Sequence, residues 1–514
     1  MTNAISRRDF LKVGGGALLA AGAVSLRMFP ADAAGGGCNV LFLMTDQHHY
    51  SVLGCAGNPV VQTPNLDRLA AEGARFPQAF IATPFCSPTR ASIITGKFPH
   101  THGINKNVDG KEKGADNSWV TTEGMLFDSG YATGHFGKWH LGSLNDVRYY
   151  KENGYAGEGY NRFITERFPA SQFKEGFSGQ AKLWGYPLYM TPACVRAHEE
   201  WLKLARRYPQ DCSLIGRTPI PRECLHESYF TDKAIEMLRT AAGNRDRRFM
   251  ITCSYSPPHA FHIICEPYYS MHDRKRIPLP PSFDQCPPAH LKTLAHVQWE
   301  QLGEEGVREY LGCYYGQVAF IDWKIGRILQ ALRELGMEKD TLVIFTSDHG
   351  DFQGAHGMVE KGAEAMYDDL TRVPLIMRYP GRIQPGAVVS TQAQCVDLMP
   401  TILDYAGMKA PNGIHGRSLR PFIEGASDDG RPVFCERTAF FSFQRMVRTH
   451  EWKYVYASRV PVELYDLRND PYEMRNLAED PAFRKVRDDL RQQLEQWMAA
   501  TGDAALERMK DPAR

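Results

Sequence analysis

Two apolar stretches far apart in the chain have the length of buried strands, and each ends in an aspartate. The first covers residues 39–44 and leads to Asp46, and the second covers residues 341–346 and leads to Asp348. Uninterrupted apolar runs of this length are typical of strands covered on both faces of a parallel sheet. Open α/β sheets place their ligands at the carboxyl ends of such strands. Strands remote in sequence can be neighbours in a sheet, so we expect that Asp46 and Asp348 can face one ion.

The pattern elsewhere predicts an α/β fold with a large mixed, mostly parallel sheet sandwiched by helices. Apolar runs at 249–255 and 375–376 are further strand candidates, and an amphipathic helix is expected over 318–335. A shorter helix over 64–72 is expected to begin after Thr63, which has the residue type of an N-cap.

From about residue 431 the pattern changes to short strands followed by one helix with an apolar stripe. The strands are expected at 446–448, 452–456 and 463–467, and the helix at 486–497. This order is typical of a smaller C-terminal antiparallel sheet with one helix packed on it. We therefore predict a catalytic α/β domain over 38–420 and a C-terminal α+β subdomain over 431–514.

Residues 86–96 have the pattern of a short helix with a thiol in its first turn. Pro88 suits that turn, where its missing N–H costs nothing, and Gly96 follows the last turn. The free N–H groups and the dipole of a helix N-terminus attract anions. Arg90 lies four residues after Cys86, so both side chains can share one face. A lone cysteine is by default a packing residue, but here a nucleophile and a cation meet at an anion-binding helix end.

Length and composition indicate a folded protein with two domains and exclude a strongly charged one. The chain has 514 residues, 43% hydrophobic and 23% charged, which suits a folded protein with one large α/β domain and a smaller one. The formal net charge is +1, so no overall field favours nucleic acid, and we expect no nucleic-acid partner.

The first 34 residues form a separate segment. Arg7 and Arg8 begin a twin-arginine pattern, an apolar run follows over 13–26, and small residues at 31–34 suit a cleavage site. The run is shorter than the ~20 residues that span a bilayer, so we expect cleavage, with an uncleaved anchor as the alternative. Residues 1–34 are therefore predicted to be a signal peptide for the bacterial twin-arginine export machinery, which makes the mature protein periplasmic or secreted.

The motif Cys86-x-Pro88-Thr89-Arg90, followed by Thr95-Gly96, resembles the signature of the formylglycine-dependent sulfatases of the alkaline phosphatase superfamily. The resemblance implies that a formylglycine-generating enzyme oxidises Cys86 to formylglycine, and that the hydrate of this aldehyde attacks a sulfate ester. Eleven of the twelve cysteines then remain, an odd number, so at least one thiol is unpaired.

A second motif, Gly130-Tyr131-x-Thr133 with Gly137-Lys138-x-His140, resembles the second signature of that family. It implies that Lys138 and His140 contact the formylglycine. The family also places a histidine after a strand such as 249–255; His259 takes that place here, with His262 as a competitor. The predicted catalytic residues are Cys86, Arg90, Lys138, His140, His259 and Lys361.

The predicted metal site combines strand-end oxygens with residue 86. Hard divalent cations prefer oxygen ligands. The candidate ligands are Asp46, Gln47, Cys86 (through an oxygen of its oxidised form), Asp348 and His349. The family often has aspartate where this chain has Gln47 and asparagine where it has His349, and an imidazole suits Ca2+ less well. One divalent cation is therefore expected: Ca2+ by resemblance, with Mn2+ or Mg2+ left open.

The mechanism that the resemblance implies is covalent catalysis. The metal and Arg90 would hold the formylglycine hydrate, and Lys138, Lys361 and His259 would neutralise the sulfuryl oxygens. Lys361 or His259 would protonate the leaving alcohol. His140 would then deprotonate the second hydroxyl so that sulfate leaves.

Three functions are open to these residues. The first is an exported sulfuric ester hydrolase acting on a small-molecule or glycan sulfate ester. The second is a phosphonate monoester or phosphodiester hydrolase of the same superfamily, because Asp46-Gln47 with Asp348-His349 resembles that branch too. The third is a catalytically silent protein that binds sulfated glycans, against which the intact catalytic set argues. Specificity is expected from the aromatic-rich segment 145–227, either a folded insertion or a satellite core, and from the loop 278–288.

Overall fold

The structure is a computed structural model of the chain. It describes residues 37–108, 112–143, 147–148, 182–183, 186–187, 215–218, 221–292, 294–361, 365–438 and 443–510. The predicted signal peptide over 1–34 and most of the segment 145–227 lie outside the described residues. Within the described part of the chain, no helix has both the length and the apolar character needed to cross a bilayer.

The central sheet has seven strands in the order β12-β2-β11-β10-β1-β8-β4. Strand β1 (Asn39–Asp46) pairs in parallel with β10 (Thr341–Ser347) on one side and with β8 (Phe249–Pro258) on the other. Thr45 lies opposite Ser347, so Asp46 and Asp348 stand at neighbouring strand ends, as the apolar runs predicted.

The outer strands make the sheet mixed. Strand β4 (Ala132–Gly137) pairs in parallel with β8, whereas β11 (Leu375–Arg378) is antiparallel to both β10 and β2 (Ala74–Arg75). Strand β12 (Ala387–Val388) is parallel to β2. The predicted mixed, mostly parallel sheet is therefore confirmed.

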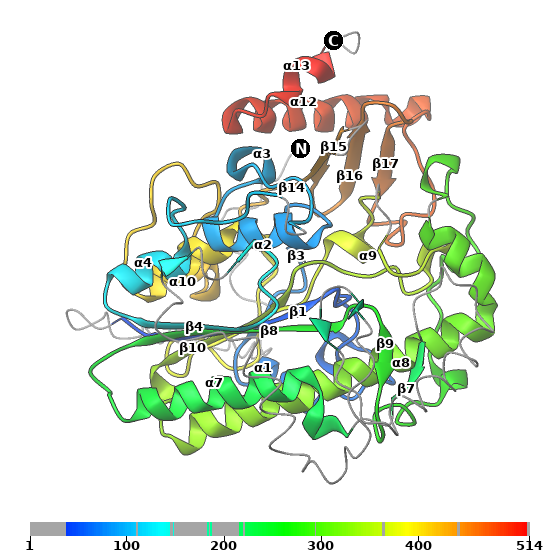
Figure 1. The fold of residues 1–514 in the computed structure, drawn as a ribbon. Helices are drawn as coiled ribbons and strands as arrows, with labels where there is room; N and C mark the ends of the chain where they lie inside the picture. Colours follow the sequence, from blue (N-terminus) through cyan, green and yellow to red (C-terminus); the bar gives the residue numbers. More distant parts are fainter. Residues whose placement is uncertain are drawn as a thin grey trace, which may run out of the picture. The chain divides into compact units, whose positions relative to one another are not determined.

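Helices cover both faces of this sheet (Figure 1). One face carries α1 (Pro64–Ala71), α7 (His226–Ala242) and α8 (Leu294–Glu334), and the other carries α2 (Cys86–Thr95), α4 (Thr122–Asp128) and α10 (Leu398–Tyr405). Along β1, Leu41 and Leu43 pack in one core and Val40, Phe42 and Met44 in the other. Successive strand residues point to opposite faces, so a strand buried on both sides needs an uninterrupted apolar run.

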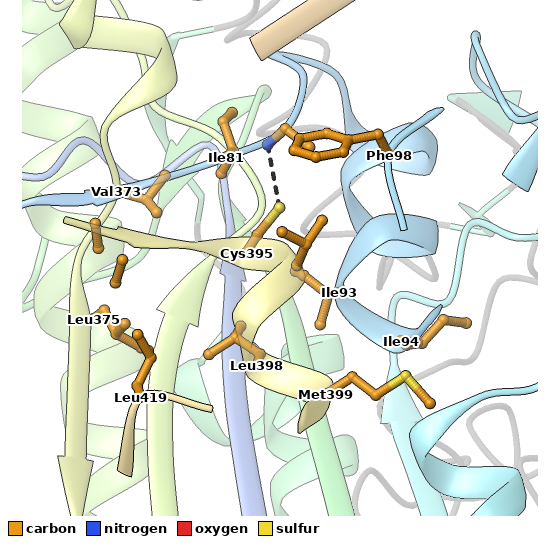
Figure 2. Packing of buried hydrophobic residues seen from close by; sticks show 14 of the residues in the cluster. Ile81, Ile93, Ile94, Phe98, Val373, Leu375, Cys395, Leu398, Met399 and Leu419 are labelled. Atoms are coloured by element: carbon orange, nitrogen blue, oxygen red, sulfur yellow. Dashed lines mark hydrogen bonds between the residues drawn. The ribbon is translucent and has the colours of Figure 1, made fainter. Parts of the chain in front are cut away.

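Helix α2 is fixed by the core that it enters. All ten of its residues are buried, and Gly96 ends it with a left-handed φ of 65°. Figure 2 shows Ile93 and Ile94 of α2 beside Leu398 and Met399 of α10. The backbone N–H that follows Ile81 donates to Cys395 Sγ at 3.1 Å, which ties the strand leading to α2 to the same core. Residue 86 is therefore presented from a rigid support.

The C-terminal part forms a four-stranded antiparallel sheet in the order β14-β15-β16-β17, as predicted. Its elements are β14 (Val433–Thr438), β15 (Phe443–Arg448), β16 (Trp452–Ala457), β17 (Glu463–Asp466), α12 (Arg484–Thr501) and α13 (Ala505–Lys510). Strand β14 was not among the predicted strands. Asp368 joins this sheet to the α/β part, because Arg448 Nη2 and Lys453 Nζ lie 2.9 and 2.6 Å from its carboxylate. The described residues between 37 and 510 form one compact unit, and the domain boundary near residue 431 stays a prediction.

Short strands and helices form further parts of the described residues. The strands are β3 (Ala79–Phe80) paired with β13 (Ala393–Gln394), β5 (Lys182–Leu183) paired with β6 (Tyr186–Pro187), and β7 (Ile215–Arg217) paired with β9 (His262–Ile264). The short helices are α3 (Pro99–His102), α9 (Asp368–Thr371) and α11 (Arg420–Ile423).

Helix α1 begins after Thr63, as predicted, but Thr63 does not cap it. The Thr63 hydroxyl donates to Asp67 Oδ1 instead. The free N–H groups of Asn65 and Leu66 donate to Asp322 of α8, at 3.1 and 2.7 Å. The cap thus comes from a residue more than 250 positions away in the sequence, which local pattern cannot reveal.

His100, in α3, forms a charged contact with the C-terminal part. Its Nδ1 lies 2.5 Å from Glu436 Oε2 in β14, and its Nε2 lies 3.2 Å from the carbonyl oxygen of Thr501, at the end of α12. Both partners only accept hydrogen bonds, which favours the doubly protonated imidazolium. Burial acts to lower the pKa of His100, but the hydrogen bond to Glu436 raises it above its usual value.

We predict that His100→Gln destabilises the protein by about 1–2 kcal/mol at pH 6 and by less at pH 9. A raised pKa in the folded state gives a stabilisation that is complete below the unfolded-state pKa, about 6.5, and is lost as pH rises through the folded value. Denaturant unfolding at both pH values measures the difference. His102→Gln is the matched control with the opposite sign: burial lowers the pKa of His102 to about 3, which costs stability below the unfolded-state pKa of about 6.5, so its replacement should be less destabilising at pH 6 than at pH 9. Equal losses for His100→Gln at both pH values would show that His100 acts by packing alone.

Candidate active site

Three segments converge at the carboxyl edge of the sheet: the ends of β1 and β10 and the first turn of α2. They bring together Asp46, Cys86, Asp348 and His349, and all four side chains are buried. One ligand atom of each (a carboxylate oxygen, Sγ or a ring nitrogen) lies within 4.8 Å of the others. The predicted strand-end residues and the predicted helix thiol thus form one cluster.

The two carboxylates of this cluster use their oxygens differently. Oδ2 of each is paired with Arg90, whose Nε lies 2.8 Å from Asp348 and whose Nη2 lies 3.3 Å from Asp46. Oδ1 of each is turned toward His349, whose Nε2 lies 3.4 Å from Asp46 Oδ1 and 3.8 Å from Asp348 Oδ1. One side of the pair is therefore neutralised, and the other faces the centre of the cluster.

Arg90 and Lys138 form the outer, cationic side. Arg90 Nη1 also donates to the carbonyl oxygen of Lys138 at 2.8 Å and to Ser254 Oγ at 2.9 Å. The Lys138 ammonium donates to Asp46 Oδ2. Gly137, the residue before Lys138, packs closely against the backbone of Ser254. It has a φ of 98°, and a Cβ there would lie 1.9 Å from the carbonyl oxygen of Ser254, so only glycine fits. Burial acts to raise the pKa of the Asp46 carboxyl, but Lys138 and His349 hold it well below its usual value.

The Cys86 thiol contacts other members of the cluster and also Lys361. Its Sγ lies 3.0 Å from Lys361 Nζ, 3.2 Å from His349 Nε2 and 3.9 Å from Asp46 Oδ1. Burial and Asp46 act to raise the pKa of this thiol, but Lys138, Lys361 and His349 hold it well below its usual value. Residue 86 is therefore placed where negative charge is stabilised.

Lys361 connects the cluster to His259. The Lys361 ammonium lies 2.9 Å from His259 Nε2 and 3.3 Å from His349 Nε2. His259 Nδ1 lies 2.9 Å from the carbonyl oxygen of Ala260, so this nitrogen carries the proton and Nε2 accepts from Lys361. The structure thus brings His259 to the site, whereas His262 contacts Gln317 and Glu360, away from the cluster.

The imidazole of His349 is oriented as a ligand would be. Its Nδ1 lies 2.9 Å from the carbonyl oxygen of Gly350, which leaves Nε2 to face the two Oδ1 atoms and the thiol. Burial and Lys361 act to lower the pKa of His349, but Asp348, Cys86 and Asp46 raise it to about 10. The cluster therefore favours positive charge at this position.

His140 and Gln47 lie beside the cluster through their backbones. The His140 carbonyl accepts from Ser87 Oγ at 2.6 Å, next to Cys86 in α2. The backbone N–H of Gln47 donates to Asp348 Oδ1 at 3.2 Å. Among the described residues, Gln47 Oε1 is a buried oxygen with no hydrogen-bond partner. The catalytic role predicted for His140 stays a prediction.

Sequence reasoning missed a polar layer behind Gln47. The layer consists of Asp351, which follows the β10 strand end, and of Tyr310 and Tyr314 on helix α8. Gln47 Nε2 donates to Asp351 Oδ2 at 2.7 Å, Tyr310 Oη donates to the same carboxylate at 2.6 Å, and Tyr314 Oη donates to the Gln47 carbonyl. A second acidic residue three positions after Asp348 was the available signal.

The donor set fits a divalent cation. Ligands at about 2.1–2.4 Å from an ion lie about 3.0–3.4 Å from one another. The distances from His349 Nε2 to Cys86 Sγ and Asp46 Oδ1 are 3.2 and 3.4 Å. The unpartnered Gln47 Oε1 offers a further oxygen. Asp46, Gln47, Asp348 and His349 can therefore hold one ion, with the side chain of residue 86 beside it.

Comparisons with known proteins agree with this geometry. A model of the sulfatase family matches residues 38–408, and a model described as the C-terminal part of N-sulphoglucosamine sulphohydrolase matches residues 354–500. The chain is similar to the N-acetylglucosamine-6-O-sulfatase of Bacteroides thetaiotaomicron, with 27% identity over 516 residues that cover 89% of this chain and 86% of that protein.

Solved structures share the fold. The phosphonate monoester hydrolase of Agrobacterium radiobacter superposes with a TM-score of 0.71 at 24% identity, covering 90% of this chain and 96% of that one. A protein solved in complex with its substrate D-glucosamine-2-N,6-O-disulfate superposes with a TM-score of 0.70 at 22% identity, covering 91% of this chain and 99% of that one.

Proposed function

The chain belongs to the sulfatase family, and from that premise we propose that it hydrolyses a sulfate ester through a formylglycine made from Cys86, beside one bound divalent cation. The observation that carries the proposal is the position of Cys86 Sγ, which lies within 3.2 Å of both Lys361 Nζ and His349 Nε2. A cysteine that only fills a core is surrounded by apolar side chains, whereas this thiol contacts a lysine and a histidine that could bind a metal. A formylglycine-generating enzyme would be the partner in maturation.

Residue 86 and its cationic neighbours carry the chemistry. When Cys86 has been converted, the formylglycine hydrate supplies an oxygen nucleophile and a second hydroxyl through which sulfate can leave. Arg90 and Lys138 hold the Asp46 and Asp348 carboxylates in place. Lys361 Nζ, at contact distance from the side chain of residue 86, neutralises a sulfuryl oxygen as charge develops there.

The tautomer of His259 supports one choice of proton donor. Because His259 Nε2 accepts from Lys361, His259 holds the ammonium toward residue 86 rather than giving a proton itself. We therefore assign the protonation of the leaving alcohol to Lys361 Nζ, with His259 as its positioning partner. His140 keeps the proposed role of base for the second hydroxyl.

Asp46, Gln47, Asp348 and His349 would hold the metal. A divalent cation bound there would polarise the sulfuryl oxygens and lower the pKa of a neighbouring hydroxyl. The family resemblance favours Ca2+, but the imidazole nitrogen of His349 suits Mn2+ better than Ca2+. We propose that Mn2+ supports activity at least as well as Ca2+.

The substrate class that we propose is a sulfated sugar. The relative from Bacteroides thetaiotaomicron is an N-acetylglucosamine-6-O-sulfatase, and a structure of the same fold was solved with a disulfated glucosamine. A cation of the C-terminal sheet lies beside the residue before Cys86: Arg437 Cζ, in β14, is 4.6 Å from the ring centroid of Phe85. A further guanidinium near the nucleophile suits a substrate that carries more than one anionic group.

Phosphonate monoester or phosphodiester hydrolysis is the second candidate. It is favoured by the similarity to the phosphonate monoester hydrolase fold and by a relative from Trinickia caryophylli, 27% identical, described as a multifunctional alkaline phosphatase superfamily protein. In both reactions a nucleophile attacks the central sulfur or phosphorus of a tetrahedral, negatively charged ester. The same cluster could therefore serve either reaction.

We also propose that the protein is exported to the periplasm or secreted. The support is the twin-arginine pattern at Arg7 and Arg8, followed by an apolar run that is too short to span a bilayer. Cell fractionation of the Arg7→Lys, Arg8→Lys variant tests this proposal, and unchanged export of that variant would contradict it.

We predict that protein matured with a formylglycine-generating enzyme hydrolyses an aryl sulfate at least about tenfold faster, in kcat/KM, than an aryl phosphodiester. Both substrates carry one negative charge, but an aryl sulfate presents three terminal oxygens to the cationic side chains beside residue 86, whereas an aryl phosphodiester presents two and a second ester group. Steady-state kinetics on the two substrates measure the ratio. The peptide containing residue 86 should be about 18 Da lighter than its cysteine form, because one oxygen replaces sulfur and two hydrogens. The opposite ranking of substrates would assign the second candidate function.

A further inference from the structure

We propose that Asp351 is a positioning residue that turns the Gln47 carboxamide so that its oxygen, and not its nitrogen, faces the metal cluster. The inference rests on the proposed function, because it concerns the cation that the cluster would hold. It adds Asp351 to the site, and it gives a physical reason for the presence of glutamine at position 47.

The geometry places Asp351 behind Gln47, with both side chains buried. Gln47 Nε2 donates to Asp351 Oδ2 at 2.7 Å. The other oxygen of Asp351 is occupied by the backbone N–H of Gln353 at 2.8 Å, and Tyr310 Oη donates to the carboxylate at 2.6 Å. The carboxylate is therefore surrounded by donors and acts as an acceptor toward Gln47.

A carboxylate partner selects one of the two orientations of a carboxamide. The amide group of glutamine has a donor end and an acceptor end that are nearly the same in shape. If the group were reversed, Gln47 Oε1 would meet the acceptor Asp351, and the NH2 group would meet the cation. In the observed orientation, Oε1 is buried and, among the described residues, has no hydrogen-bond partner. Gln47 Oε1 is thus available to bind a cation.

The backbone of Gln47 is held as firmly as its side chain. Gln47 has a left-handed φ of 64°, which is uncommon for a residue other than glycine. Its N–H donates to Asp348 Oδ1, and its carbonyl accepts from Tyr314 Oη. Tyr310 and Tyr314 lie one turn apart on α8, so one helix fixes both Asp351 and Gln47. Orientation of a ligand by such outer contacts changes metal affinity by about 10–100-fold when it is lost.

The test measures Mn2+ binding by metal-free protein, in competition with a fluorescent chelator. Asp351→Asn keeps the size of the side chain but turns an NH2 group toward Gln47, which must then reverse. We expect the Kd for Mn2+ to rise about tenfold or more. Asp322→Asn is the matched control, because it changes another buried aspartate that caps α1 and does not contact Gln47; its Kd should stay within about twofold of the wild type.

A second pair of variants distinguishes positioning from a general structural role. Gln47→Glu alone sets two carboxylates face to face and should also weaken Mn2+ binding. Combined with Asp351→Asn, the new glutamate can accept from the asparagine NH2 and still offer an oxygen to the cation, so the Kd should return to within about threefold of the wild type. This pair carries the test even if Asp351→Asn alone does not fold.

The outcomes separate the inference from the proposed function. An unchanged Kd in Asp351→Asn, or no recovery in the double variant, would overturn the positioning role while leaving sulfate hydrolysis by the wild type intact. A wild-type protein that binds no divalent cation would overturn the metal in the proposed function and this inference together.

Discussion

Cys86→Ala will lower kcat/KM for a sulfate ester by about 10^4-fold or more while the protein still folds. The side chain of residue 86 is the one group of the cluster that can become the nucleophile, and alanine offers neither a thiol to oxidise nor an oxygen. The fold should survive because α2 is held by Ile93 and Ile94, which lie two turns away from residue 86. The loss of Sγ from a buried position costs about 1–2 kcal/mol. Steady-state kinetics and thermal unfolding of the two proteins measure both effects.

Cys253→Ala is the matched control for this experiment. Cys253 lies in β8 and is fully buried in the core on the other face of the sheet, where its thiol shares a hydrogen bond with the hydroxyl of Tyr255. Its replacement should cost a similar free energy of unfolding, while kcat/KM stays within about threefold of the wild type. Retained activity in Cys86→Ala would rule out the covalent scheme as a whole.

The cluster of candidate metal ligands could be predicted from the sequence because strand ends are local signals. The apolar run before Asp46 and the one before Asp348 each predict a strand buried on both faces, and parallel strands carry their carboxyl ends to one edge. The structure places β1 and β10 side by side in that way. The helix that contains residue 86 could also be predicted from the sequence, because Pro88 and Gly96 mark its first turn and its end.

The partners of these residues could not be predicted, because they come from distant segments and no periodicity links them. The choice between His259 and His262 depended on which side of a short loop faces Lys361, and only the contact between Lys361 Nζ and His259 Nε2 places His259 there. Asp351 was overlooked for a related reason: its proposed role depends on Tyr310, which lies on α8 but before the helix predicted over 318–335. The family resemblance supplied the chemistry of residue 86, which residue types alone do not specify.

Removal of the divalent cation will lower activity by about a thousandfold or more, and a divalent cation will restore it. A bound metal contributes several kcal/mol to transition-state stabilisation, and about 4 kcal/mol corresponds to that factor. Dialysis against a chelator followed by addition of Mn2+, Mg2+ or Ca2+, with kcat/KM measured at each step, tests this. Full activity in protein shown by elemental analysis to hold no metal would contradict it.

Asp348→Asn provides the genetic counterpart of metal removal. Arg90 Nε donates to Asp348 Oδ2, so an asparagine there must turn its oxygen toward Arg90 and its NH2 group toward the centre of the cluster. In the wild type, Oδ1 of Asp348 faces His349 Nε2 and accepts from the N–H of Gln47. In the variant, an NH2 group takes the place of this oxygen and cannot bind a cation. We expect a loss of activity as large as that caused by the chelator, which added Mn2+ does not reverse. The buried guanidinium of Arg90 keeps an oxygen partner, so the loss should come from metal binding and not from unfolding. A variant that regains wild-type kcat/KM at high Mn2+ would show that Asp348 serves Arg90 rather than the ion.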